Sequence, residues 1–437
     1  MGATGTKRTA GTAGTAGATD AAGTAGAVHE GRGPVRYGPL APDAGLPALP
    51  ELVAVLADAA GGTSPEPPGG GPVLREAACG YWSRRGLPTH PQEAAAAAGP
   101  QPLLLALLAA HGGDILMPRP HPASWAPQAR LLGRPVFQVP TPAECGGIPD
   151  PYAFLETVRR VRAEGGTPRL LLLSIADDPT GTVAPPELLR EACEAAVGEG
   201  LHIISDETWR DTLHRPYGTV PLSPAEMWPE DVTVFFDLAG AFTPASWPAA
   251  VARFPATSGG AVRRARTLDH LTALGALVAG PVAAAAAYAL DEPAAVTGRI
   301  AAAAALHARV AGAVHHAVLT AGALARPPQA GRHLYADLGP VRRALAARGV
   351  GDSMELEEFL GERLGMPVPG GHRFGDELGA LRVRLATGPL LGSTREERME
   401  SLTAVEPLEL PHVAEALSIL TAALTELREP LEPLEPR

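Results

Sequence analysis

The sequence predicts an α/β protein whose main sheet is mostly parallel, accompanied by a smaller α+β domain. Residues 170–175 and 232–236 are continuous apolar runs, which are typical of strands buried on both faces of a sheet. Helical segments rich in Ala and Leu alternate with such runs, as expected when helices cover both faces. After a long Ala-rich helix the strands change character, which indicates the second domain.

The individual elements follow from local patterns. Pro186 can open a helix, because a proline at the first helical position loses no hydrogen bond, and Gly198 and Gly200 can end it. Along residues 381–386 the apolar side chains alternate with Arg382 and Arg384, which predicts a strand with one buried face. We expect strands at 114–117, 134–139, 170–175, 201–205, 232–236, 333–337, 367–369 and 381–386, and helices at 186–198, 298–324 and 411–427.

The predicted domain organisation has five parts. The leader, 1–33, is rich in Gly, Ala and Thr and has too few large apolar groups to offset its ordering entropy, so we expect it to be disordered. Residues 34–70 form an N-terminal arm and part of the small domain. The large domain covers 71–315, the C-terminal small domain 316–427, and a Glu/Pro-rich tail 428–437.

Composition excludes several classes of protein. The net charge of -11 argues against a nucleic-acid binder. The three cysteines show neither a disulfide framework nor a zinc-binding spacing. The longest apolar stretches are too short to cross a bilayer, and the leader lacks the features of a signal peptide, so we expect a cytoplasmic protein without membrane association.

Four ordered motifs carry a resemblance to a known family. They are Gly70-Gly-Pro-Val-Leu-Arg-Glu-Ala, Asp178-Pro-Thr-Gly, Ser205-Asp-Glu-Thr-Trp209, and the segment from Asp237 to Pro248 with its Phe242 and Trp247. Together with a late segment around Leu381-Arg382-Val, they resemble the class I/II aminotransferases, which have fold type I and use pyridoxal phosphate (PLP). The resemblance covers residues 36–427 and implies a homodimer with a pocket at the subunit interface.

Two family positions keep their chemistry. An aspartate that pairs with the pyridine nitrogen of the cofactor matches Asp206. The arginine that grips the substrate carboxylate as a bidentate fork matches Arg382. Asp178 and Trp209 match the positions that contact the phenolic oxygen of the ring. An ionised Asp178 only accepts hydrogen bonds, whereas the indole of Trp209 can donate one.

Other family positions have lost their chemistry. The lysine that forms the Schiff base matches Gly240, and the only lysine in the chain is Lys7, in the leader. The phosphate-binding arginine matches Pro248, and one phosphate-binding serine matches Asp237, whose charge would repel a phosphate. The ring-stacking aromatic matches Pro122. At the helix start Gly99-Pro-Gln-Pro, two prolines remove N–H donors from the family's phosphate cradle.

Three functional interpretations remain open. The first is a degenerate aminotransferase homologue: a structural or regulatory pseudoenzyme in amino-acid-derived or specialised metabolism, as a homodimer or paired with an active aminotransferase. The second is an enzyme with a repurposed pocket that uses non-covalent PLP or its amine form, PMP, or no cofactor. The third is a protein that binds an amine or amino acid. We expect no catalytic residue at the position of Gly240.

The substitutions also predict a change of charge in the pocket. If the loops lie as in the family, Asp178, Asp206 and Asp237 converge. Such a pocket would prefer a cation, either an amine or a metal ion with oxygen ligands. The alternative is that these aspartates only cap loops and turns.

Overall fold

The computed structural model describes residues 45–63, 65–215 and 218–428. The predicted leader and most of the predicted tail therefore lie outside the described residues. Contacts group residues 37–437 into one unit. The division of that unit into large and small domains at the predicted boundaries stays a prediction.

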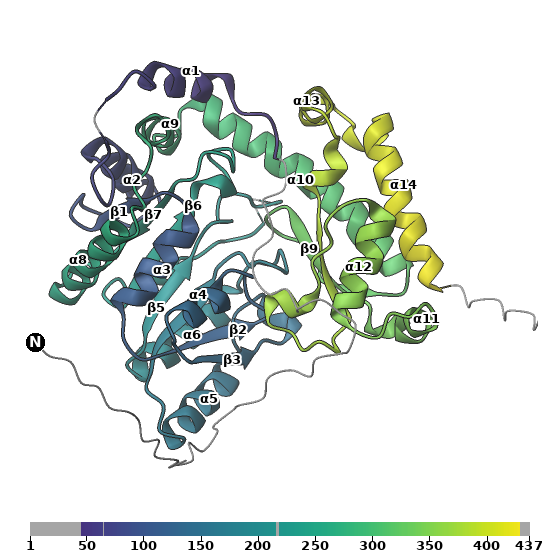
Figure 1. Cartoon of the computed structure of the whole chain (residues 1–437), viewed down its shortest axis with the longest axis horizontal. Helices are drawn as coiled ribbons and strands as arrows, with labels where there is room; N and C mark the ends of the chain where they lie inside the picture. The colour runs from purple at the N-terminus through teal and green to yellow at the C-terminus, as the bar shows by residue number, and fades with distance from the viewer. Residues whose placement is uncertain (1–44, 64, 216–217, 429–437) are drawn as a thin grey trace, which may run out of the picture. The chain divides into compact units, whose positions relative to one another are not determined.

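The centre of the fold is a seven-stranded sheet with the order β1-β7-β6-β5-β4-β2-β3 (Figure 1). Neighbouring strands from β6 to β3 run parallel, whereas β7 is antiparallel to both β6 and β1. The strands are β1 Ala94–Ala97, β2 Asp114–Arg119, β3 Val136–Pro140, β4 Pro168–Ser174, β5 His202–Asp206, β6 Val232–Asp237 and β7 Ala250–Arg253. This mixed, mostly parallel sheet confirms the predicted fold class.

Alternate side chains of the central strands enter two different cores. Leu171, Ile203 and Val234 belong to one buried cluster, and Leu172 and Ile204 belong to the cluster on the opposite face. Successive side chains of a strand point to opposite faces of the sheet. Because helices cover both faces, both sets of side chains are buried, which explains the continuous apolar runs. The helices that precede β6 in the chain are α1 Pro50–Ala59, α2 Pro72–Arg84, α3 Pro100–Ala110, α4 Trp125–Leu131, α5 Pro151–Ala163, α6 Pro186–Gly198 and α7 Pro224–Met227.

A second, three-stranded sheet has the order β10-β9-β8 and is antiparallel. Its strands are β8 Leu324–Ala325, β9 His333–Asp337 and β10 Arg382–Ala386. Residues 367–369 form no strand, so that prediction was wrong; only the neighbouring Gly370 makes an isolated bridge to Val383. The two sheets have separate hydrophobic clusters.

Helix α10 links the two regions of the fold. It spans Ala294–Thr320, and its residues from Leu306 onward contribute to the core of the small sheet (Figure 1). Its contacts include α13, α14 and β9. The remaining helices are α8 Ser258–Ala273, α9 Gly280–Leu290, α11 Arg342–Ala347, α12 Ser353–Leu364, α13 Arg395–Thr403 and α14 Pro411–Thr425. In the described part of the chain, no helix is long and apolar enough to cross a membrane.

Candidate functional site

The candidate site lies where three parallel strands end. Asp206 is the last residue of β5, Asp237 is the last residue of β6, and Asp177 and Asp178 follow β4. Carboxyl ends of parallel strands meet at one edge of a sheet, which is the usual place for ligands in α/β folds. The charge of Asp206 interacts with those of Asp177, Asp178 and Asp237, so the structure brings the predicted aspartates together.

Asp178 is held by a cation that the sequence analysis did not assign. Nη1 of Arg384 donates to both carboxylate oxygens of Asp178, at 2.9 and 3.2 Å, and Nε2 of His333 lies 3.3 Å from Oδ1. Burial alone would raise the pKa of Asp178, but Arg384 and then His333 outweigh it, so that pKa is lowered. Asp178 is therefore an ion-pair partner within the site.

Arg382 lies apart from this cluster. Its Nε donates to Oδ2 of Asp337 at 3.0 Å and its Nη1 to Asp376 at 3.2 Å, and its side chain is 38% exposed. Arg384 is two residues further along the same strand face and is the arginine that contacts Asp178. Arg384, and not Arg382, therefore contacts Asp178. That Arg382 binds a substrate carboxylate stays a prediction.

Neither Asp206 nor Asp237 forms an ion pair with a residue that the structure describes, although the positive charge of Arg332 acts on Asp237. Asp206 accepts a hydrogen bond from the Thr208 N–H at 2.9 Å, and Asp237 accepts one from the Ala239 N–H at 3.1 Å. Burial raises the pKa of Asp206 to about 7 and that of Asp237 to about 6. For Asp177, burial likewise raises the pKa to about 7. Asp206 and Asp237 thus cap the loops that follow their strands, and their charges and that of Asp178 interact. That the three aspartates together bind a cation stays a prediction.

Aromatic groups and imidazoles complete the site. The Trp209 ring meets His333 edge-on at 5.3 Å, and the Arg332 guanidinium lies 5.7 Å from the Trp209 ring centre. His121 lies beside Pro122 and interacts with the charge of Asp178, and burial lowers its pKa to about 4. Within the described residues, no group of three or more His, Cys, Asp or Glu side chains could hold a metal ion.

Gly240 lies in a tight position. A Cβ added to it would be 2.1 Å from the carbonyl oxygen of Thr208, so a side chain requires the backbone to move. Nη2 of Arg332 donates to the Gly240 carbonyl at 2.9 Å. Arg332 precedes a strand that the sequence predicts, but nothing in the local pattern indicated that it reaches this loop.

The start of α3 contacts the loop after β6. Gly99, with φ of 101°, is the N-cap of α3, and a Cβ added to it would lie 3.3 Å from the Cβ of Pro248. Pro100 and Pro102 have no N–H to donate at this helix terminus. The apolar ring of Pro248 and the two prolines leave this helix start with few donors for an anion.

Comparisons with known proteins agree with the fold. The family model of aminotransferase class I and II matches residues 44–235. The aspartate/prephenate aminotransferase of Thermus thermophilus is 32% identical over 212 residues, 47% of this chain and 52% of that protein. A probable aspartate/prephenate aminotransferase of Thermus aquaticus is 33% identical over 195 residues, 43% of this chain and 48% of that protein. The chain thus spans about half the length of these relatives.

Solved structures extend the likeness to most of the chain. The aspartate aminotransferase from Thermus thermophilus with maleate has a TM-score of 0.71 at 22% identity, covering 88% of this chain and 90% of that one. The aromatic aminotransferase from Pyrococcus horikoshii has a TM-score of 0.71 at 19% identity, covering 88% and 94%. Residues 44–235 thus resemble the class I and II aminotransferases in sequence, and the chain as a whole has the fold type I architecture of these solved structures.

Proposed function

We propose that this chain is an aminotransferase homologue that does not catalyse transamination through a lysine-bound cofactor. The observation that carries the proposal is the environment of Gly240: the family's Schiff-base position has no side chain, and its backbone packs against Thr208. Lys7, the only lysine of the sequence, lies outside the described residues. Without an amine at this position, no imine can form there and no proton can be moved by it.

The phosphate end of the pocket supports the same proposal. Arginine is replaced by Pro248, two prolines begin α3, and the Asp237 carboxylate occupies the adjoining loop. A phosphate dianion needs N–H donors and cations, and these residues supply neither. At the ring itself, Asp206 retains a suitable role as a partner for a ring nitrogen, and the indole of Trp209 can still donate a hydrogen bond. The residues present therefore do not fit a covalently held PLP, and any PLP or PMP would bind non-covalently.

The role that remains is that of a structural or regulatory subunit. We infer a homodimer, or a pair with an active aminotransferase, because the family places its pocket between two subunits. Specialised or amino-acid-derived metabolism is the setting that the resemblance suggests. Such a subunit would act through its surface and its ligand rather than through turnover.

The test is to incubate the purified protein with PLP, reduce with borohydride, and locate any adduct by mass spectrometry. Lys7→Ala is the matched control. We expect no adduct outside Lys7 and the chain's amino terminus, and no transamination of aspartate with 2-oxoglutarate in either protein. Turnover that disappears in the Lys7→Ala variant would refute the proposal and make the leader lysine a catalytic group.

The aspartate cluster favours a second candidate function, the binding of an amine. Asp206 and Asp237 are desolvated carboxylates, and only Asp237 interacts with a nearby cation, Arg332, so an ammonium group would satisfy both charge and hydrogen bonding. Calorimetry with putrescine checks this, with Asp206→Asn as the variant that should abolish the heat. Equal heats for both proteins would exclude this site.

A further inference from the structure

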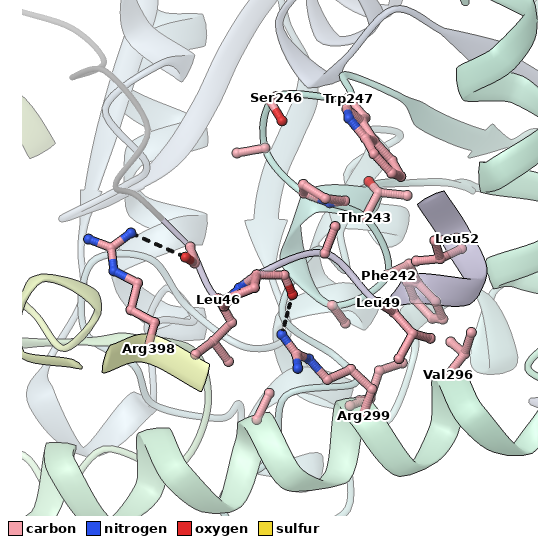
Figure 2. A pocket seen from close by; sticks show the side chains of 18 of the residues that line it. Leu46, Leu49, Leu52, Phe242, Thr243, Ser246, Trp247, Val296, Arg299 and Arg398 are labelled. Carbon is pink, nitrogen blue, oxygen red and sulfur yellow. Dashed lines mark hydrogen bonds between the residues drawn. The ribbon is translucent and has the colours of Figure 1, made fainter. Parts of the chain in front are cut away.

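A cavity of about 660 Å³ lies beside the candidate site, with three walls from distant parts of the sequence (Figure 2). One wall is the arm 45–49, the second is the loop 241–247 after β6, and the third is the face of α10 around Arg299. This volume is in the range of cavities that hold drug-sized small molecules.

The described residues that line the cavity carry a net positive charge, although the chain carries a net charge of -11. The described residues that line it include Arg299, Arg332 and Arg398 and neither Asp nor Glu. Arg299 donates to the Pro47 carbonyl, and Arg398 donates to the Gly45 carbonyl at 3.3 Å (Figure 2). These bonds go to backbone carbonyls, so they orient the two guanidinium groups without neutralising them. Nε of Arg398 also donates to the Gly392 carbonyl. Since each guanidinium has five N–H donors, both keep several that no described residue accepts from.

A buried hydroxyl marks the same cavity independently. Thr243 lines it and is only 7% exposed, yet its Oγ1 makes no hydrogen bond to any residue that the structure describes. A buried polar group without a partner is costly, and a ligand atom is one way to satisfy it. Phe242, Trp247 and Ile300 supply an apolar surface beside this hydroxyl.

The geometry points to a binding site for an organic oxyanion, a carboxylate or phosphate ester with an apolar body, in the cavity between the arm, the 241–247 loop and α10. The guanidinium groups would bind the oxyanion, since their planar forks match carboxylate and phosphate oxygens. The hydroxyl of Thr243 would donate a further hydrogen bond, and the aromatic wall would cover the apolar body. This goes beyond the proposed function, since Arg299, Arg398 and Thr243 are not part of the aspartate cluster.

The test is calorimetry with two anionic probes, phenyl phosphate and phenylacetate, and the neutral phenylacetamide. We expect one or both anions to bind and the neutral amide not to bind, and the stronger anion identifies the oxyanion preferred. Arg299→Gln and Thr243→Val should each weaken anion binding by about tenfold, the loss typical of one hydrogen bond to a charged group. Thr243→Ser keeps the hydroxyl and should retain binding. Arg190→Gln, on the exposed surface of α6, is the control for general loss of positive charge.

Three outcomes would overturn the inference. Binding of phenylacetamide as tight as that of phenylacetate would show that charge is not recognised. An equal loss in Arg190→Gln would show non-specific attraction. If no probe binds and Arg299→Gln instead changes the molar mass in light scattering, the arginines serve a subunit interface. Thermal unfolding of each variant separates loss of binding from loss of folding.

Discussion

The carboxylate of Asp178 and the guanidinium of Arg384 join the loop after β4 to strand β10 of the small sheet, 206 residues further along the chain. The side chains are 18% and 19% exposed, so this is a largely buried ion pair between the two sheets' regions. Breaking such a pair leaves one charge without a partner, which usually costs more than the pair contributes.

We therefore predict that Asp178→Asn lowers the free energy of unfolding by about 3 kcal/mol, because Arg384 keeps its charge in the pocket. Urea unfolding at neutral pH measures the loss. Glu194→Gln, which removes an exposed partner of Arg190 on α6, is the control and should change stability by less than about 0.5 kcal/mol. A loss no greater than that of the control would mean that Arg384 finds other partners.

The ion pair between Asp178 and Arg384 also predicts that the stability of the fold depends on pH in the acid range. The folded pKa of Asp178 is below its ordinary value of 3.8, mainly through Arg384. The folded state then binds fewer protons than the unfolded state, so the contribution is complete above pH 3.8 and is lost as pH falls through the folded pKa. The difference in stability between the parent protein and Asp178→Asn should shrink below pH 4. A difference that stays constant would remove the ion pair from the explanation.

We expect the contribution of Asp206 to stability to have the opposite pH dependence. Burial raises its pKa from 3.8 to about 7, so the folded state holds its proton more tightly than the unfolded state. Its contribution is favourable below pH 3.8 and is lost as pH rises through about 7. As pH rises from 5 to 8, Asp206→Asn should therefore become more stable relative to the parent by about 2–3 kcal/mol. Thermal unfolding at the two pH values measures this.

The control for that experiment is Asp58→Asn, since Asp58 is an exposed residue of α1. Its stability difference from the parent should be the same at both pH values. A loss of stability of Asp206→Asn at pH 8 would indicate that a cation accompanies Asp206 in the purified protein, in line with the amine-binding candidate.

We expect substitutions of Gly240 to destabilise the fold for steric reasons. Gly240→Ala puts a Cβ 2.1 Å from the Thr208 carbonyl, and the resulting shift should cost about 1–3 kcal/mol. Gly298→Ala is the matched control: it lies in α10 with open space around its Cβ, and should stabilise by about 0.5–1 kcal/mol through helix propensity. Gly240→Lys should be destabilised and form no adduct with PLP. A stable Gly240→Lys protein that forms an imine would show that the site needs only its lysine.

The central strands β4, β5 and β6 of the main sheet were predictable because each contains an apolar run of the length typical of buried strands. β1 and β7 were missed since each is only four residues long and Ala-rich, so their pairing depends on neighbours rather than on pattern. Arg382 and Arg384 share one strand face, and periodicity cannot separate them. Their roles are set by register: Arg382 pairs with Asp337, whereas Arg384 pairs with Tyr335 nearer the pocket. Such register, like the reach of Arg332 to Gly240, depends on contacts between distant segments.

The three cysteines give a last prediction, which tests how closely the residues around each thiol are packed. Burial raises the pKa of Cys79 to about 11 and that of Cys193 to about 12, and burial likewise raises the pKa of Cys145. Since the thiolate is the reactive form, a thiol reagent at pH 8 should modify none of them in the folded protein and all three after unfolding in guanidinium. Absorbance of the released thiolate counts the reacting groups. Rapid modification of Cys193 in the native state would mean that α6 does not pack against β5 as described, because this thiol is fully covered there.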